Sequence, residues 1–244
     1  MNVLEKYYEE NLYPLQNGVL NIVKKSGTPF FLTGGTALSR YYVHHRYSGD
    51  LDLFVINDPD YSSHVTTLLK SFVDEEVDGR FKLDRSGIVR GKNFTQLFMV
   101  DKKNPEVELK IDLVNDVAAH YGRIIDVPIL GRIDSMRNIL SNKLTALFRS
   151  EPKDVVDIQA IAKIEAFNWK SIVNEAKSKE AGVEPEVVYD LLMSFPIKHF
   201  DDIKWIKRPE DIDFELDVKT IANDILFGRE NSLGVSDGAL SGRY

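Results

Sequence analysis

Two aspartates, Asp50 and Asp52, stand two residues apart at the head of an apolar run that extends to Ile56. Because side chains alternate between the faces of a β-strand, this spacing predicts that both carboxylates point the same way, with Cα atoms roughly 6.6 Å apart. Two carboxylates at that separation can share divalent cations, and Mg²⁺ favours a few carboxylates together with substrate phosphates. The pair therefore indicates metal-dependent chemistry on a phosphorylated substrate.

A glycine turn, Gly34-Gly35-Thr36, precedes the aspartates in the chain. Residues without Cβ let backbone N–H groups approach a phosphate closely, and the threonine hydroxyl adds a further polar group. We expect a helix to begin at this turn, where free N–H groups favour an anion. Arg40 and Arg46 are candidates for contacting a triphosphate, with a solvated surface arginine as the alternative for each. A phosphate cradle before a metal-binding pair suggests nucleotide chemistry.

The Asp-x-Asp spacing is not specific by itself, since it recurs at 58–60 and 211–213. Pro59 makes the first of these a turn, and the second lies in an acidic stretch without a glycine turn nearby. Only the pair beginning at Asp50 follows a glycine turn and leads into an apolar strand. Two exposed acids after a tight turn remain the alternative interpretation.

Two blocks of the sequence resemble a known family. The block GGTALSRYY…RYSGDLDLF, from Gly34 to Phe54, resembles the first motif of the nucleotidyltransferase superfamily. The block NKLTALFRSEPKDVVDIQAI, from Asn142 to Ile161, is similar to the Lys…Lys/Arg-Asp-x-x-Asp motif of AbiEii/AbiGii-type toxins. These toxins belong to type IV toxin–antitoxin and abortive-infection systems. Two motifs in the family's order are more specific than either one alone.

The resemblance implies Mg²⁺-dependent transfer of a nucleotide from an NTP to an acceptor hydroxyl, with Mn²⁺ as the alternative metal. It implies an RNA end, such as that of a tRNA, as the acceptor and a cognate antitoxin as a partner. Asp50 and Asp52 would be catalytic metal ligands, Lys143 would offer a positive charge to the triphosphate, and Asp154 would position Lys143 or the nucleotide. Asp157 is a further nucleotide-binding candidate. A small-molecule nucleotidyltransferase, a kinase-like phosphotransferase and a catalytically silent nucleotide-binding module remain alternatives.

A third carboxylate is expected from a neighbouring strand. The pattern predicts strands near 81–90, 94–101 and 106–114, and the last places Glu106, Glu108, Lys110 and Asp112 on one face. In the superfamily a third carboxylate lies beside the Asp-x-Asp strand, and Asp112 is our choice as a catalytic metal ligand that helps to deprotonate the acceptor. Glu108 and Asp116 are the next choices, and a charged face on an exposed strand is the alternative.

The helical half carries charges on apolar helix faces. Asp134 or Ser135 is expected to cap a helix to about Arg149, in which Lys143 falls on the apolar arc. Such a lysine needs an anionic partner or a route to solvent. Since the next helix carries aspartates on its apolar arc, we expect these arcs to line a polar cleft. Replacing an unpaired Lys143 by Met should then lower activity without lowering the melting temperature.

These patterns together predict an α+β protein with a mixed sheet. We expect a nucleotidyltransferase-like catalytic domain over 1–128, a helical domain that completes the nucleotide cleft over 129–227, and a disordered tail over 228–244. The chain has no cysteine, which excludes disulfides and thiolate metal sites. It shows no signal-peptide pattern and no apolar run near the ~20 residues of a membrane span, so we expect a soluble cytoplasmic protein. The net charge of −7 argues against a generally basic nucleic-acid binder.

Overall fold

The computed structural model describes residues 1–76 and 79–234, which fall into two compact units. The first unit contains Met1–Tyr41 and Tyr47–Ser135, and the second contains Tyr42–Arg46 and the chain from Met136 onward. None of the described helices combines the length and the apolar composition that crossing a membrane requires.

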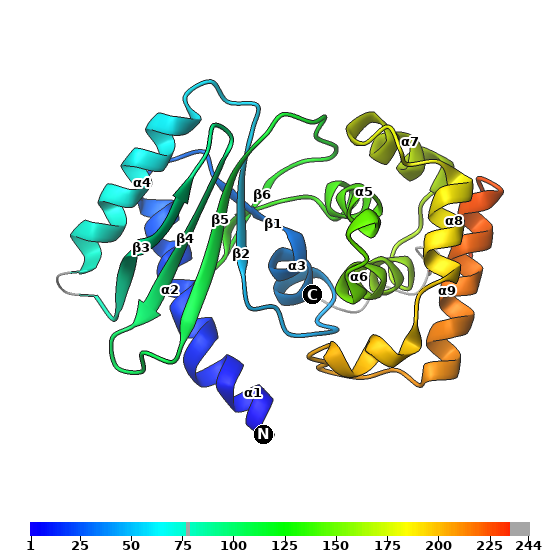
Figure 1. The fold of residues 1–244 in the computed structure, drawn as a ribbon, viewed down its shortest axis with the longest axis horizontal. Coiled ribbons are helices and arrows are strands. Elements are labelled where there is room, and N and C mark those ends of the chain that lie inside the picture. Colours follow the sequence, from blue (N-terminus) through cyan, green and yellow to red (C-terminus); the bar gives the residue numbers. More distant parts are fainter. Residues whose placement is uncertain (77–78, 235–244) are drawn as a thin grey trace. The chain divides into compact units, whose positions relative to one another are not determined.

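Seven strands of the described residues form one mixed sheet in the first unit, in the order β3-β4-β5-β2-β1-β7-β6 (Figure 1). Strand β2 pairs in parallel with β5 and antiparallel with β1. The strands are β1 Phe31–Thr33, β2 Leu51–Ile56, β3 Phe81–Arg90, β4 Phe94–Asp101, β5 Glu108–Asp116, β6 Ile125–Val127 and β7 Gly131–Ile133. The α+β class expected from the sequence is confirmed, and the expected strands 81–90 and 94–101 match β3 and β4.

The expectation that the chain becomes helical directly after Pro128 is wrong. Strand β7 returns the chain to the sheet, where Ile133 pairs in parallel with Leu32 of β1. Ile129 and Gly131 both adopt positive φ angles in the turn that leads into β7. Three-residue strands are too short to show an alternating pattern, so the sequence had no signal for this hairpin.

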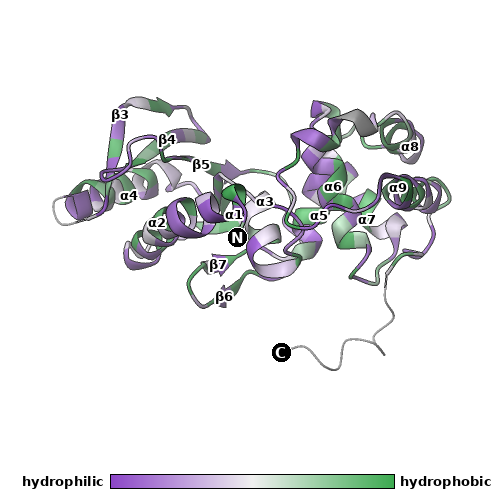
Figure 2. Cartoon of the chain, turned by 90° about the horizontal axis from the view of Figure 1, so that it is seen from below, coloured by the Kyte–Doolittle hydropathy of each residue, from purple (hydrophilic) through white to green (hydrophobic). Residues whose placement is uncertain are grey.

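One face of the sheet is apolar and the other carries polar side chains. Along β2, Leu51, Leu53 and Val55 are fully buried, whereas Asp52 between them is half-buried. The same alternation places Asp112 of β5 between two buried residues. The amphipathic helices α2 (Tyr13–Lys25) and α4 (Tyr61–Glu76) lie along the sheet in Figure 1, and Figure 2 shows hydrophilic and hydrophobic residues along both. The carboxylates thus lie on the face opposite the core.

Shorter helices complete the first unit. Helix α1 (Val3–Tyr7) runs through a π-helical turn, Tyr8–Leu12, into α2. Helix α3 (Gly34–Ala37) follows β1 directly and continues as a π-helical turn, Leu38–Tyr42. The helix expected at the glycine turn is therefore present, starting at Gly34.

The second unit is helical. Its core contains the fully buried Trp169, Phe200 and Phe214, of which Phe200 and Phe214 stack edge to face with ring centroids 4.3 Å apart. Its helices are α5 Met136–Ala146, α6 Pro152–Ala162, α7 Trp169–Lys179, α8 Pro185–Met193 and α9 Asp211–Leu226, with 3₁₀ turns at Leu147–Arg149 and Ile197–Asp202.

The first residues of the expected disordered tail pack against this helical unit. Asn231 is buried and its amide donates to the carbonyl oxygens of Ala162 and Glu165, both at 2.7 Å. The Ser232 hydroxyl lies 3.0 Å from Asp224 Oδ1. These contacts hold the chain beyond Gly228, while residues 235–244 of the expected tail lie outside the described residues.

Candidate active site

Parallel pairing of β2 with β5 brings the acidic residues of the first unit together. Asp52 and Asp112 are direct partners in the strand register. Asp50 comes immediately before β2, with its side chain 47% exposed. Lys110, on the same face of β5 as Asp112, is under the electrostatic influence of all three carboxylates. Of the three candidates for the third carboxylate, the structure places Asp112 beside Asp52, whereas Glu108 and Asp116 pair elsewhere along the ladders.

Lys110 is the cation of this acidic group. Its Nζ lies 2.9 Å from Asp112 Oδ2 and 3.6 Å from Asp50 Oδ2. Burial alone would lower the pKa of Lys110, but the hydrogen bond to Asp112 and the charges of Asp50 and Asp52 raise it above its usual value. Gln96 of β4 donates to the other oxygen of Asp112, Oδ1, at 2.9 Å. Both oxygens of Asp112 therefore already accept a hydrogen bond. The sequence placed Lys110 on this face but did not indicate its role.

The glycine turn reaches this group through Gly34. Thr33 pairs with Asp52 in the β1–β2 ladder, so Gly34 follows directly at the end of β1. Gly34 has a φ of +66°, and a Cβ at this position would overlap the carboxylate of Asp52. Glycine is thus required here both by the backbone conformation and by the close approach. From the sequence we expected a positive φ at Gly35, and this is wrong, because the positive φ belongs to Gly34.

Thr36 holds the loop that precedes Asp50. Its hydroxyl is buried and lies 2.5 Å from the Asp50 carbonyl oxygen and 2.9 Å from the Ser48 hydroxyl. This hydroxyl is engaged within the protein, and its expected contact with a triphosphate stays a prediction. Gln16 of α2 supports the same loop by donating to the carbonyl oxygens of Ser48 at 3.1 Å and Gly49 at 3.3 Å. These contacts position Asp50.

Arg40 is engaged with α2. Its guanidinium donates to Gln16 Oε1 at 3.1 Å and to Asn17 Oδ1 at 2.7 Å, and it lies over the Tyr13 ring at 4.4 Å from the centroid. Burial lowers the pKa of Arg40, and Tyr13 partly opposes this shift. Arg40 therefore orients the glutamine that supports the Asp50 loop, and its expected contact with a triphosphate stays a prediction.

Asp134 anchors the end of β1. The Thr33 hydroxyl donates to Asp134 Oδ2 at 2.6 Å, and His120 Nε2 lies 2.9 Å from Oδ1. Asp134 is fully buried. From the sequence we expected Asp134 or Ser135 to cap the helix that begins at Met136. Asp134 fixes the residue before Gly34, and its Oδ1 also accepts from the Ser135 backbone N–H at 2.8 Å, directly before that helix.

A second polar group is built within the second unit. Arg46 donates to both carboxylate oxygens of Asp157, at 2.7 and 2.8 Å. Lys143 Nζ lies 2.6 Å from Asp157 Oδ2 and 2.7 Å from Asp154 Oδ1. His45 Nε2 lies 2.7 Å from Asp157 Oδ1. Both aspartates are fully buried and Lys143 is 7% exposed.

Charge compensation within this group is extensive. Burial alone would raise the pKa of Asp157, but Arg46 and Lys143 hold it well below its usual range. Burial would likewise lower the pKa of Lys143, yet Asp157 and Asp154 raise it. Lys143 is therefore paired, and the expectation of an unpaired lysine is wrong. Arg46 and Asp157, both expected to bind nucleotide, bind each other in the structure, and their contact with a nucleotide stays a prediction.

His45 differs from its neighbours in this group. Burial lowers the pKa of His45, although the hydrogen bond to Asp157 works against this shift. Its Nδ1 is buried and has no hydrogen-bond partner among residues 1–76 and 79–234, so a proton there would be an unsatisfied donor. The neutral imidazole with hydrogen on Nε2 fits this site. The sequence assigned no role to His45, because no local pattern connects it to a residue more than 100 positions away.

The acidic residues of the first unit provide carboxylate donors for a divalent cation. Carboxylate oxygens are the donors that Mg²⁺ prefers, and Asp50 and Asp52 supply them beside the glycine turn. Among the described residues, however, no three His, Cys, Asp or Glu side chains form a ready-made metal-binding group. Gln96 and Lys110 each donate to one oxygen of Asp112, and each of those oxygens keeps a second lone pair. Metal binding by Asp50, Asp52 and Asp112 stays a prediction.

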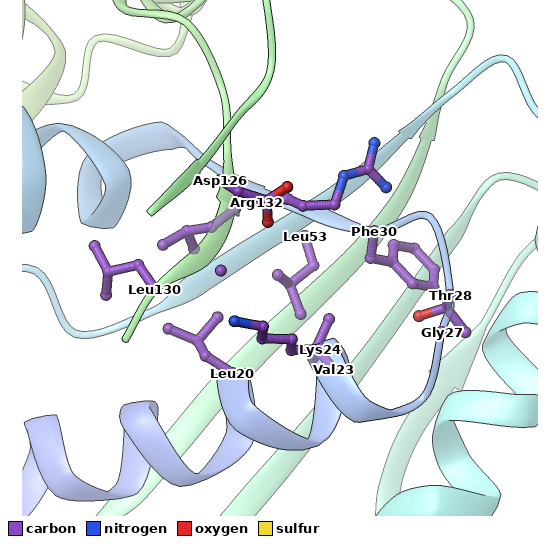
Figure 3. A pocket seen from close by; sticks show the side chains of 12 residues that line it. Leu20, Val23, Lys24, Gly27, Thr28, Phe30, Leu53, Asp126, Leu130 and Arg132 are labelled. Carbon is purple, nitrogen blue, oxygen red and sulfur yellow. The ribbon is translucent and has the colours of Figure 1, made fainter. Parts of the chain in front are cut away.

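A pocket of about 280 Å³ lies on the other face of the sheet in the first unit (Figure 3). Its walls include Leu20 and Val23 of α2 and Leu53 of β2. Since Leu53 and Asp52 point to opposite faces of β2, this pocket does not open onto the carboxylates. We do not assign the proposed chemistry to it.

A family model covers most of the chain. The family described as "Nucleotidyl transferase AbiEii toxin, Type IV TA system" matches residues 22–231. A search of curated proteins finds no match.

Solved structures show the same fold. MenT4, a nucleotidyltransferase toxin from Mycobacterium tuberculosis, superposes with a TM-score of 0.65 at 16% sequence identity, over 91% of this chain and 85% of MenT4. A structure described as a putative nucleotidyltransferase from Helicobacter pylori gives 0.58 at 18% identity, over 89% and 96% of the two chains. JHP933 from the same organism gives 0.56 at 18% identity, over 89% and 93%.

Proposed function

Since the chain belongs to the AbiEii family of nucleotidyltransferase toxins from type IV toxin–antitoxin systems, we propose that it transfers a nucleotide from an NTP to a hydroxyl at an RNA end, such as that of a tRNA. The observation that carries this proposal is the contact between a glycine turn and an acidic group. Gly34 is held at a positive φ directly against the carboxylate of Asp52, with Asp50 on the preceding loop.

Each residue of the first unit has a role in this proposal. Backbone N–H groups at Gly34 and Gly35 hold the triphosphate, and Asp50 and Asp52 hold Mg²⁺, with Mn²⁺ as the alternative. The bound metal would neutralise charge that develops on the attacking and leaving oxygens. Asp50 has the more exposed carboxylate and faces the substrate. Asp112 completes the metal site and helps to deprotonate the acceptor, and Gln96 and Lys110 each donate to one of its oxygens.

Lys143 and Asp154 keep the catalytic roles that the family resemblance implies as a prediction. In the structure they form a buried ion pair, with Arg149 NH2 at 2.9 Å from the second oxygen of Asp154. Their pairing explains how a charged motif is accommodated on apolar helix faces. Activity of the Lys143→Met variant tests whether this ion pair also serves turnover.

The family implies a cognate antitoxin as a partner. The RNA acceptor rests on the toxin family, and a small-molecule acceptor or transfer of the γ-phosphate would use the same carboxylates. The test is incubation with α- and γ-labelled NTPs, Mg²⁺ and total cellular RNA. Label from the α-position in RNA supports the proposal, whereas transfer from the γ-position alone would identify a kinase. The Asp52→Asn variant is the matched control, since it removes one charge and keeps the side-chain shape.

A further inference from the structure

Phe98 is an aromatic residue on the polar face of the sheet. Along β4 it alternates with the buried Leu97 and Met99, so its ring points to the face that carries the carboxylates. In the β4–β5 ladder Phe98 pairs directly with Lys110, whose Nζ lies 3.6 Å from Asp50 Oδ2. A half-buried phenyl ring therefore lies on the same face as the acidic group, with β5 between them.

Gly87 of β3 supports this ring. A Cβ at Gly87 would lie 2.9 Å from Phe98 Cδ2, which is closer than a Cβ atom packs. Gly87 does not have a positive φ, so the close approach of the ring, and not the backbone conformation, calls for glycine here. The β3 backbone thus holds one edge of the ring. A ring that is already held in place loses little conformational freedom when a flat ligand binds to it.

The order of the strands places Phe98 and the glycine turn on opposite sides of the carboxylates. Strands β4, β5, β2 and β1 are neighbours in that order, with Phe98 on β4, Asp52 on β2 and Gly34 at the end of β1 (Figure 1). Neighbouring strands are about 4.8 Å apart, so β4 and β2 are separated by roughly 9.6 Å. A ribose and its base can bridge that separation.

The chemistry of transfer also needs two sides. In the proposed reaction the acceptor oxygen bonds to the α-phosphorus, its proton passes to Asp112, and pyrophosphate leaves from the opposite side of the phosphorus. A triphosphate held at the glycine turn therefore leaves the Phe98 side of the carboxylates to the acceptor.

The β3–β4 hairpin carries the charge that binding of RNA requires. Residues 80–103 contain seven lysines and arginines and two aspartates, in a chain whose net charge is −7. Arg80 and Arg85 pair with acidic residues, whereas Lys82 is exposed and lies on the same face of the sheet as Phe98. A basic surface beside an aromatic ring is the combination by which proteins bind single-stranded nucleic acid.

We propose that Phe98 is the stacking platform for the terminal base of an RNA acceptor. This inference rests on the proposed nucleotidyltransferase function and deepens it, because it makes the acceptor a nucleotide and not a small molecule without a base. The base stacks on Phe98, its ribose hydroxyl reaches the carboxylates across β5, and the preceding phosphates lie along the β3–β4 hairpin. Every base has a face that can stack, so Phe98 selects a nucleotide end without reading its sequence.

The experiment measures stacking directly and does not depend on turnover. A short single-stranded RNA with 2-aminopurine as its 3′-terminal base is titrated with the whole protein, and the fluorescence of that base is followed. Stacking on an aromatic ring quenches this fluorescence, so the wild-type protein should quench it on binding. Phe98→Leu should lose the quenching and raise Kd at least about fivefold, whereas Phe98→Tyr keeps a ring and should retain the quenching and the affinity.

Phe94→Leu is the matched control. Phe94 lies on the same strand and the same face, is 39% exposed, and is four residues from Phe98, roughly 14 Å along the strand. Its replacement should leave quenching and affinity as in wild type. Gly87→Ala keeps Phe98, but its Cβ would displace the ring. It should therefore reproduce the loss of quenching even if Phe98→Leu folds poorly.

A wild-type protein that leaves the 2-aminopurine fluorescence unchanged would overturn the inference, as would equal quenching by Phe98→Leu. In transfer assays Phe98→Leu should raise KM for the RNA and leave KM for the NTP unchanged. A rise in KM for the NTP instead would assign the ring to the base of the NTP and overturn the proposal. Quenching that depends on Phe98, without transfer of the α-label, would refute the proposed function and leave this inference intact.

Discussion

Replacing Lys143 by Met tests the buried charge group of the second unit. Lys143 contacts both Asp154 and Asp157, at 2.7 and 2.6 Å. Methionine keeps most of the aliphatic length and removes the charge. The sequence suggested that this change would leave the melting temperature unchanged or raise it. The structure reverses that prediction, because two fully buried carboxylates would lose a shared cation.

The magnitude follows from the remaining partners. Removing one member of a buried ion pair costs about 3–5 kcal/mol when the other is left uncompensated. Here Arg149 still contacts Asp154, and Arg46 still holds Asp157 with two hydrogen bonds. We therefore expect Lys143→Met to lower the free energy of unfolding by about 3 kcal/mol, the lower end of this range. For a protein of this size each kcal/mol lowers the melting temperature by about 2–4 °C, which gives a decrease of about 6–12 °C.

Tryptophan fluorescence is the appropriate assay. Both tryptophans of the chain, Trp169 and Trp205, belong to the second unit, so their emission reports on the unit that contains Lys143. Trp169 is fully buried and should shift to longer wavelength on unfolding. Thermal unfolding followed at this signal gives the melting temperature of the relevant unit.

Lys163→Met is the matched control. Lys163 is also in the second unit, but its side chain is 51% exposed and pairs with Asp217 at 3.0 Å. Its loss should cost less than about 1 kcal/mol. A melting temperature for Lys143→Met equal to or above that of wild type would refute the reasoning. Activity measured below the melting temperature then tests the catalytic role separately, with a loss of at least about a hundredfold, or 2.7 kcal/mol, expected if Lys143 serves turnover.

Gly34→Ala should reduce nucleotide transfer at least about tenfold, because a Cβ would displace the Asp52 carboxylate and strain the positive φ; wild-type transfer rates would show that the close approach is unimportant. Thr36→Val should lower the rate while Thr36→Ser restores it, since only serine keeps a hydroxyl near the Asp50 carbonyl, and equal rates for both would count against this role. The second unit should lose stability as the pH falls below about 6.5, the unfolded pKa of histidine, because the folded protein lowers the pKa of His45 and so binds fewer protons. His45→Gln should remove this dependence in urea unfolding followed by tryptophan fluorescence, and an unchanged slope would exclude His45 as its source. A further loss below about pH 4 is expected from Asp157, whose folded pKa is depressed.

Local patterns predicted much of the sheet. Alternating apolar residues and hairpin turns located β3 and β4, and the same alternation placed Asp52 and Asp112 on polar faces. The choice of Asp112 over Glu108 needed the family resemblance, because the register of parallel strands depends on contacts between distant segments. The structure supplies that register directly.

The sequence did not predict which residues the charged side chains contact. Arg46 and Asp157 are separated by 111 positions, and no local pattern links them. Arg40 and Thr36 were expected to contact phosphate because of their positions at and after the glycine turn, and the sequence did not show that Arg40 also contacts α2 and Thr36 the loop before Asp50. Helical periodicity correctly identified Lys143 as a charge on an apolar arc, but it could not show that two aspartates already compensate it.

The central claim is that the carboxylates beside the glycine turn carry nucleotidyl transfer. The most direct measurement compares wild-type protein with Asp52→Asn for transfer of label from the α-phosphate of an NTP, with Mg²⁺ as the only metal. We predict that transfer falls at least about a hundredfold, or 2.7 kcal/mol, while thermal unfolding stays close to wild type. Equal α-label transfer by the folded Asp52→Asn protein would contradict the claim.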